Sequence, residues 1–201
     1  MFTGIVTDVG EVLDVERRAE GLSRFRVGCH YRSESIAVGA SVACAGICLT
    51  VIATGEAGDG STFEVEAAVE TLMTTTAGRW RAGTRINLER SLAVGDELSG
   101  HLVTGHVDGL AEIIAREDLP DMARLAVRAP PSLSRFIAPK GSVTLDGVSL
   151  TVNAVERDTF STLVIPHTLR VTTFGTSRKG DALNLEVDLI ARYAARLLEK
   201  S

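Results

Sequence analysis

The sequence Gly4-Ile-Val-Thr-Asp-Val-Gly-Glu-Val12 occurs a second time in this chain, as Gly105-His-Val-Asp-Gly-Leu-Ala-Glu-Ile113. The two copies are 101 residues apart, and the same offset separates Gly46-Ile-Cys-Leu-Thr-Val51 from Gly147-Val-Ser-Leu-Thr-Val152. A constant offset over separate blocks indicates an internal duplication, which decides the architecture before any single element is assigned. We therefore expect the chain to contain the same structural unit twice.

Two further blocks extend the duplication toward the end of each copy. Glu70-Thr-Leu-Met-Thr-Thr-Thr-Ala-Gly78 matches His167-Thr-Leu-Arg-Val-Thr-Thr-Phe-Gly175, and Gly83-Thr-Arg-Ile-Asn-Leu-Glu89 matches Gly180-Asp-Ala-Leu-Asn-Leu-Glu186, both at an offset of 97 residues. The first copy thus carries four additional residues near Gly55–Gly60. Matches in one order along the chain predict two homologous domains, joined near residues 93–99.

Alternation of apolar and polar residues predicts mainly β-structure in both copies. Phe25, Val27 and Cys29 alternate with arginines, and the same two-residue period occurs at 63–67 and 183–187. This period is typical of strands with one buried face. With 19 glycines and only 4% aromatic residues, we expect short strands, tight turns and a core of Val, Leu, Ile and Ala. Strands with few helices favour a small closed antiparallel barrel in each half, since closure removes the sheet edges.

Helical segments are few in the predicted fold. Short helical turns are expected after Glu70-Thr-Leu and His167-Thr-Leu, and at Pro131–Phe136. One longer helix is predicted near the end of the chain, where apolar residues recur every three or four positions, at Leu189, Ile190, Tyr193, Ala194, Leu197 and Leu198. Asp188 is placed to cap its start by accepting backbone N–H bonds. The apolar stripe of this helix has two potential uses, packing between subunits or docking on the chain's own barrel.

Composition indicates a globular protein and argues against several functional classes. The 201 residues are 45% hydrophobic and 23% charged, the ordinary balance for a protein with a buried core. The net charge of −5 gives no general cationic field for nucleic acid or for an anionic membrane surface, and no apolar stretch is long enough to span a bilayer. An oligonucleotide-binding barrel is disfavoured by the acidic balance and by the few aromatic residues.

The first residues and the cysteines favour a cytoplasmic protein. The start of the sequence has no basic segment followed by an apolar one, as a secretory leader would have. Cys29, Cys44 and Cys48 are odd in number and lack a Cys-x-x-Cys pair, which favours free thiols. His101 and His106 do not complete a zinc spacing with these cysteines, and no dinucleotide or P-loop motif occurs. We therefore expect neither a metal nor an external cofactor.

Four motifs in one order resemble the signatures of the riboflavin synthase family. They are Met1-Phe-Thr-Gly-Ile-Val6, the block 46–51, Asp96-Glu-Leu-Ser-Gly-His-Leu-Val-Thr-Gly-His-Val-Asp108 and Asp146-Gly-Val-Ser-Leu-Thr151. The resemblance covers essentially the whole chain. No single motif is decisive, but the ordered set on a duplicated frame is specific.

This resemblance implies a fold, an activity and partners. The implied fold is all-β, with two homologous six-stranded Greek-key barrels at residues 1–96 and 97–188 and a C-terminal α-helix at 189–201 that assembles a homotrimer. The implied reaction is the dismutation of two 6,7-dimethyl-8-ribityllumazine molecules, in which a four-carbon unit passes from one to the other. Its products are riboflavin and 5-amino-6-(ribitylamino)uracil. In the family the site lies between the N-terminal barrel of one subunit and the C-terminal barrel of the next. An association with lumazine synthase is a further expectation.

Substrate-binding residues follow from the duplication together with the resemblance, which assigns one substrate to each half. The first pocket is expected to be lined by Cys48, Leu49, Thr50, Glu66, Ala67, Ala68, Val69, Glu70 and Thr71. The second is expected to be lined by Ser149, Leu150, Thr151, Ile165, Pro166, His167, Thr168, Leu169 and Arg170. Glycine allows a backbone to approach a flat ring closely, as expected at Gly4, Ile5, Val6, Gly105, His106 and Val107. Lys140 is expected to reach the ligand from the neighbouring subunit. For the threonines, β-branched strand packing is the alternative role.

Unequal residues at matched positions are candidates for catalysis, because one substrate donates carbon and the other accepts it. Cys48 and Ser149 occupy matched positions, and either could assist addition at C7 of the lumazine ring, directly or through water. His106 stands where the first copy has Ile5, and an imidazole can move protons near neutral pH. The alternatives are a structural role for His106 and a buried, inert role for Cys48.

Asp146 and Asp188 complete the catalytic candidates as proton or hydrogen-bond partners, although Asp188 could instead serve only as the helix cap. Two positions depart from the family's pattern. His167 stands where the family commonly has Glu before Thr-Leu, and Ala45 stands where it often has Asn before glycine.

A non-catalytic carrier resembling lumazine protein is the alternative function. It needs one good pocket, whereas both copies here retain their Gly, Thr and Leu-Thr positions, which favours the enzyme.

Overall fold

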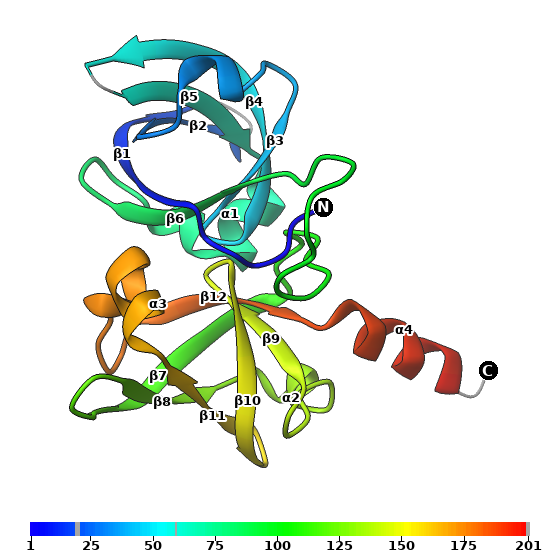
Figure 1. Cartoon of the computed structure of the whole chain (residues 1–201). Helices are drawn as coiled ribbons and strands as arrows, with labels where there is room; N and C mark the ends of the chain where they lie inside the picture. The colour runs from blue at the N-terminus through cyan, green and yellow to red at the C-terminus, as the bar shows by residue number, and fades with distance from the viewer. Residues whose placement is uncertain (19–20, 59, 200–201) are drawn as a thin grey trace.

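Two closed six-stranded antiparallel barrels make up most of the protein, stacked one on the other with a helix that extends from the second (Figure 1). The computed structural model describes residues 1–18, 21–58 and 60–199. The first barrel consists of β1 (Asp8–Arg17), β2 (Ser23–Cys29), β3 (Ser41–Cys44), β4 (Ile47–Ala57), β5 (Gly60–Ala67) and β6 (Arg85–Arg90). The second consists of β7 (Gly109–Asp118), β8 (Ala123–Arg128), β9 (Ser142–Leu145), β10 (Val148–Glu156), β11 (Thr159–Val164) and β12 (Ala182–Val187).

Both barrels have the same strand order, so the duplication predicted from the sequence is confirmed in the fold. The first closes in the order β1-β2-β5-β4-β3-β6, and the second repeats this order from β7 to β12. The register shifts also repeat. A bulge follows Val12 in β1 and Ile113 in β7, and another follows Val51 in β4 and Val152 in β10. Bulges bend and twist a strand locally, which allows a small sheet to close on itself.

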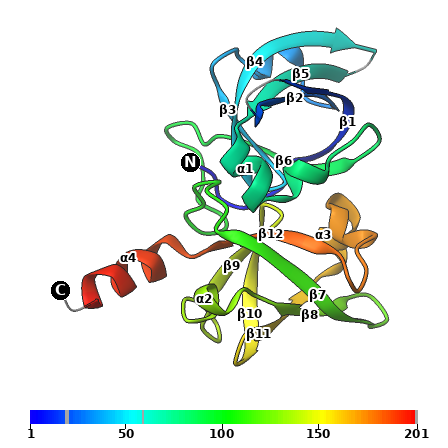
Figure 2. The ribbon, with the colours of Figure 1, turned by 180° about the vertical axis from the view of Figure 1, so that it is seen from behind.

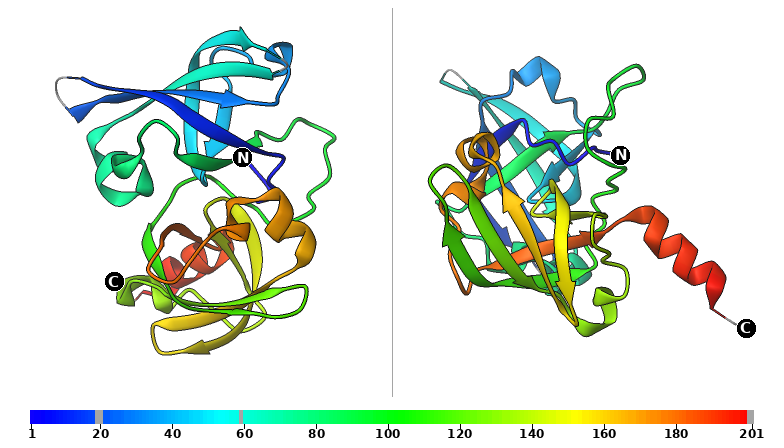
Figure 3. Two further views of the ribbon diagram at one scale, coloured as in Figure 1. Left: turned by 90° about the vertical axis from the view of Figure 1, so that its left-hand side faces the viewer. Right: turned by 60° about the horizontal axis from the view of Figure 1, so that its bottom comes forward.

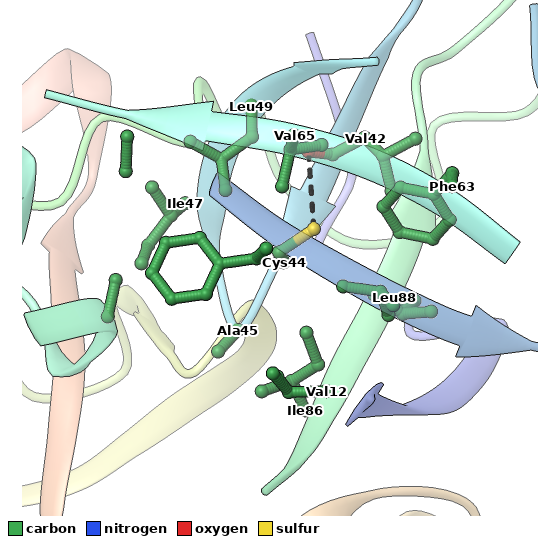
Figure 4. Packing of buried hydrophobic residues seen from close by; sticks show 14 of the residues in the cluster. Val12, Val42, Cys44, Ala45, Ile47, Leu49, Phe63, Val65, Ile86 and Leu88 are labelled. Carbon is green, nitrogen blue, oxygen red and sulfur yellow. Dashed lines mark hydrogen bonds between the residues drawn. The ribbon is translucent and has the colours of Figure 1, made fainter. Parts of the chain in front are cut away.

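Alternation along the strands places one face of each strand inside its barrel. In β2, Phe25, Val27 and Cys29 are buried while Arg26 is exposed, as predicted. Figure 4 shows how aliphatic and aromatic side chains fill the first barrel around Cys44, whose thiol donates to the Val42 carbonyl at 3.9 Å. Burial raises the pKa of this thiol, so it remains protonated and acts as a small apolar residue.

Short helical segments connect the strands. They are α1 (Val69–Thr74), α2 (Pro131–Ser134), α3 (Pro166–Val171) and the 3-10 turns 33–35, 76–79 and 173–175. The helices α1 and α3 include the Glu70-Thr-Leu and His167-Thr-Leu segments that were expected to precede them, and the turn at 33–35 was not predicted. The matched residues Thr75 and Thr172 cap the turns at 76–79 and 173–175 by accepting an N–H from Ala77 and Phe174. Among the described residues, no helix has the length and apolar character needed to cross a membrane.

The helix α4 (Leu189–Leu198) extends away from both barrels (Figures 1 and 2). Asp188 caps it by accepting the Ile190 N–H at 2.8 Å, as predicted. Arg192 forms an ion pair with Asp108 at 2.7 Å and fixes the start of the helix to the second barrel. Beyond the half-buried Leu189, its large apolar residues do not dock on the chain's own barrel, since the exposed fractions are 69% for Ile190, 61% for Tyr193, 86% for Leu197 and 82% for Leu198.

Two asparagines join the barrels at their seam. Asn87 in β6 donates to the Asp146 carbonyl at 2.9 Å, and the matched Asn184 in β12 donates to the Ala45 carbonyl at 2.8 Å. Each side-chain oxygen accepts an N–H from the 3-10 turn of the opposite domain. Ala45 therefore takes part in the seam through its backbone carbonyl, from a left-handed conformation with a φ of 47°. The further views in Figure 3 show the two barrels next to each other from two more directions.

Candidate active site

Each barrel is crossed by a segment of chain from the other half. The Ser149 N–H donates to the Gly4 carbonyl and the Cys48 N–H donates to the Gly105 carbonyl, both at 2.8 Å. An antiparallel bridge between Phe2 and Val103 joins the two crossing segments. The first residues of the chain thus lie on the second barrel, while the segment before β7 lies on the first.

Glycine is required where these segments cross. Gly4 and Gly105 have φ angles of +76° and +77°, in the left-handed region that favours glycine. A Cβ atom at Gly4 would lie 2.6 Å from Cβ of Ser149, and one at Gly105 would lie 2.6 Å from Cβ of Cys48. The repeated Gly4 and Gly105 of the sequence therefore place backbone directly against the two matched candidate residues.

Two buried glutamates hold the crossing segments in place. Glu89, in β6, accepts hydrogen bonds from Thr3 N at 2.7 Å, Thr3 Oγ1 at 2.9 Å and Gly4 N at 3.0 Å. Glu186, in β12, accepts the matched bonds from Thr104 N at 2.7 Å, Thr104 Oγ1 at 2.6 Å and Gly105 N at 2.9 Å. Burial raises the pKa of Glu89, against the lowering effect of its N–H and O–H donors. Neither glutamate was a predicted site residue, although both end a block that repeats in the sequence.

The crossing makes each prospective pocket composite. Val6 packs against the core of the second barrel, and Val107 packs against the core of the first. Residues of the two halves therefore meet at each site: Gly4 and Val6 with Ser149, and Gly105 and Val107 with Cys48. Ile5 and His106, which directly follow the two glycines, have exposed side chains.

Residues of β4 and β10 divide between the barrel core and the outer face. Cys48 and Ser149 are half-buried and Thr50 and Thr151 are exposed, whereas Leu49 and Leu150 pack inside the two barrels. The outer face is thus the one that can touch a ligand through side chains. Of the predicted residues in these strands, the two leucines contribute instead to the wall behind it.

The predicted residues at the ends of β5 and β11 lead into α1 and α3. Ala67 is buried in the first core, whereas Val69 and Ile165 are each 52% exposed. Glu66 forms ion pairs with Arg18 at 3.2 Å and Arg24 at 2.9 Å. Residues on the surface of these segments are Ala68, Glu70, His167 and Arg170, and the half-buried ones are Thr71, Pro166, Thr168 and Leu169.

Asp146 lies at the seam between the two barrels. It occupies the turn between β9 and β10 with a φ of 45°, and its carboxylate accepts the Asn184 N–H at 2.8 Å. Burial raises its pKa to about 7. A cavity of about 340 Å³ at this seam includes Asp146 but no other residue of the predicted site.

Lys140 is exposed and occupies a left-handed turn with a φ of 67°, while its N–H donates to the Val152 carbonyl at 2.7 Å. The side chain is thus free of the barrel core. Among the described residues, no group of three or more His, Cys, Asp or Glu side chains is arranged to hold a metal ion.

Comparison with known proteins identifies the family. Residues 3–91 and 104–188 both match the family model described as the lumazine binding domain. A riboflavin synthase of Brucella abortus is 54% identical over 200 residues, which are 99% of this chain and 98% of that protein. The chain belongs to the riboflavin synthase family. Two more riboflavin synthases, from Mycobacterium bovis and Bacillus subtilis, are 39% and 35% identical to this chain. Both alignments cover 100% of this chain, and they cover 100% and 91% of the respective relatives.

Solved structures share the fold of this family member. LumP in complex with riboflavin superposes with a TM-score of 0.82 at 23% sequence identity, covering 93% of this chain and 99% of LumP. LumP in complex with 6,7-dimethyl-8-(1'-D-ribityl) lumazine gives a TM-score of 0.79. At this identity the likeness establishes the common architecture, two barrels in tandem.

Proposed function

We propose that this protein is a transferase that converts two molecules of 6,7-dimethyl-8-ribityllumazine into riboflavin and 5-amino-6-(ribitylamino)uracil by transfer of a four-carbon unit. The observation that carries the proposal is the 54% identity to a riboflavin synthase over nearly the full length of both chains. The doubled lumazine-binding domain supports it, because a dismutation needs two similar sites for two identical molecules.

The duplicated barrels supply the geometry that the reaction needs. Each composite pocket would hold one heterocycle between a crossing segment, Gly4–Val6 or Gly105–Val107, and the outer face of β10 or β4. Holding both substrates converts a bimolecular encounter into an effectively unimolecular step, worth up to about 7–11 kcal/mol when the alignment is good. Residues at the starts of α1 and α3 would line the two pockets and contact the ribityl tails of the substrates.

Within these pockets, we assign the chemistry to the residues that differ between the halves. Either Cys48 in one pocket or Ser149 in the other would assist addition at C7 of the lumazine ring, directly or by positioning water. His106, exposed beside Gly105, would exchange protons with the ligand, because one nitrogen of a neutral imidazole donates a proton and the other accepts one. Asp146 and Asp188 remain proposed proton or hydrogen-bond partners; in the structure, Asp146 accepts the Asn184 N–H and Asp188 caps α4.

Assembly into a homotrimer would bring unlike barrels of neighbouring subunits together. The exposed apolar residues of α4 support this proposal, since such a surface is stabilised when a second subunit covers it. Lys140 would then reach the ligand of the adjacent subunit. We place the protein in the cytoplasm, where an association with lumazine synthase would deliver the substrate.

A carrier of the LumP type is the second candidate, because LumP shares the fold and its solved complexes contain riboflavin or a lumazine. Mixing the protein with 6,7-dimethyl-8-ribityllumazine and following riboflavin absorbance separates the two functions. The enzyme produces riboflavin over many turnovers. Saturable quenching of lumazine fluorescence without riboflavin formation would contradict the proposed activity and support the carrier.

A further inference from the structure

The two prospective pockets differ at a pair of matched positions on neighbouring strands. In the second barrel, Ser149 of β10 lies directly across from Thr144 of β9, so two hydroxyl side chains are neighbours. In the first barrel the matched pair is Cys48 of β4 and Ala43 of β3. The duplication therefore kept the backbone arrangement and changed its chemistry.

His101 connects the two hydroxyls of the second barrel. Its Nδ1 lies 2.7 Å from Ser149 Oγ, and its Nε2 lies 3.2 Å from Thr144 Oγ1. Both ring nitrogens are thereby occupied, one by each hydroxyl. In either neutral tautomer, one nitrogen donates and the other accepts, so the ring orientation is fixed from both sides.

The crossing segment of the chain holds the backbone at His101. The His101 N–H donates to the Thr3 carbonyl at 3.1 Å. At the preceding Gly100, a Cβ atom would lie 2.0 Å from the same carbonyl oxygen, so a side chain cannot be accommodated there. The imidazole therefore approaches Ser149 on a backbone that is pinned against Thr3, which Glu89 holds in turn.

The first pocket offers its thiol a different environment. Cys48 packs against Phe2, Ala43 and Val103, a small apolar cluster. In the part of the chain that the structure describes, the Cys48 thiol has no hydrogen bond matching that of the Ser149 hydroxyl. Ser149 is thus the candidate whose polar atom has a defined direction.

We infer that His101 is a positioning residue that fixes the Ser149 hydroxyl for the ligand in the second barrel, while Thr144 fixes the imidazole. This inference rests on the proposed function, because it assigns a role to Ser149 in the reaction. Burial lowers the pKa of His101, whereas the negative charges of Asp188 and Glu186 raise it. The net shift is downward, which keeps the ring neutral and able to hold a hydroxyl at neutral pH.

Steady-state kinetics of His101→Phe, Ser149→Ala and the double variant test this role. We expect each single substitution to lower kcat at least about tenfold with KM changed less than about threefold. The double variant should lose no more than the worse single one, because residues that act through one contact are not additive. His101→Asn, whose side chain can bond Ser149 again, should recover part of kcat. Thr162→Val, which removes a hydroxyl of the same barrel that has no hydrogen-bond partner among the described residues, should leave kcat unchanged and serves as the control.

Additive losses in the double variant, or an unchanged kcat in His101→Phe, would overturn the inference. NMR of the His101 ring nitrogens provides a readout that does not depend on turnover. The wild-type protein should show one neutral tautomer, and Ser149→Ala should change its ring shifts and pKa. If the wild-type protein forms no riboflavin, the proposed function fails, and with it a role in that reaction. An unchanged ring signal in Ser149→Ala would overturn the contact itself.

Discussion

Thr162 in β11 carries a fully buried hydroxyl with no hydrogen-bond partner among the described residues. The matched position in the first barrel, 97 residues earlier, is Val65, which has nearly the same shape and is also fully buried. A buried polar group without a partner costs about 1–3 kcal/mol. The second barrel therefore contains a local destabilisation that the first lacks.

Thr162→Val should increase the free energy of unfolding by about 1 kcal/mol, because it removes an unpaired hydroxyl at nearly constant volume. Urea denaturation followed by circular dichroism measures the change. Thr172→Val is the matched control and should destabilise the protein, since the Thr172 hydroxyl donates to the Thr168 carbonyl at 2.6 Å. A loss of stability in Thr162→Val would show that its hydroxyl has a partner after all.

Asp146 predicts a pH dependence of stability. Its pKa is raised from 3.8 to about 7 in the folded chain, so between these values the folded state binds a proton that the unfolded state has lost. Proton binding by Asp146 therefore stabilises the folded state, and this contribution to the free energy of unfolding is fully present below about pH 4. The contribution is lost as the pH rises through about 7.

Asp146→Asn removes this dependence. The amide oxygen can still accept the Asn184 N–H, and Asn tolerates the φ of 45°. The gain in melting temperature over wild type should be larger at pH 8 than at pH 5. The same difference at both pH values would contradict the raised pKa.

At this scale the sequence could identify residues that differ between matched positions but not their contacts. Cys48, Ser149 and His106 follow from the alignment of the two halves. Glu89 and His101 do not, because their partners Thr3 and Ser149 are far away in the sequence and meet them only through the crossing segments. The signal that the sequence did contain is that the same glutamate ends the repeated block in both halves, at Glu89 and Glu186.

At the scale of elements, the crossing segments are the feature on which both pockets depend. Alternating apolar residues predicted the strands and barrels, since that pattern reports which face is buried. The exchange of segments between halves leaves no such pattern. A tight crossing requires glycine at position 4 whichever barrel the segment covers, so the residue type does not indicate the barrel. Phe2 and Val103 lie in the same cluster, yet nothing in their spacing states which barrel they cover.

Gly105→Ala should displace the segment from Cys48, because the new methyl group would meet Cys48 Cβ at 2.6 Å and its backbone nitrogen at 2.8 Å. We expect a loss of about 2 kcal/mol of stability and at least about a tenfold loss of kcat/KM. Gly83→Ala is the matched control, since Gly83 has a φ of +86° but no atom lies within 4 Å of the position that its new methyl group would take. Equal effects of the two substitutions would mean that the close approach is unimportant.

At the scale of the whole molecule, the two barrels of one chain are held back to back by the reciprocal contacts of Asn87 and Asn184. The duplicated sequence predicted two such units, and the fold confirms them. How the units meet depends on side-chain amides that reach the opposite turn, which no local pattern encodes. The apolar stripe of α4 was visible in the sequence, and its exposure supports the subunit-packing use over docking on its own barrel.

Replacing Ile190 and Leu197 together by Asp should convert the proposed trimer to monomers, because each apolar side chain would lose its place in the interface. Turnover should fall by at least about tenfold if the site lies between subunits, while each barrel remains folded. Size-exclusion chromatography with light scattering gives the mass. Val38→Asp, at another exposed apolar residue, is the control and should change neither the mass of the assembly nor the rate of turnover. A wild-type protein that is fully active as a monomer would contradict the assembly.

Product stoichiometry tests most directly whether this chain brings two like molecules together for reaction. Purified protein is incubated with 6,7-dimethyl-8-ribityllumazine, and substrate and products are quantified by chromatography over the time course. The account predicts two lumazine molecules consumed for each riboflavin formed, with an equal amount of 5-amino-6-(ribitylamino)uracil. Persistent binding with no consumption of lumazine, or riboflavin formed without the pyrimidine, would contradict it.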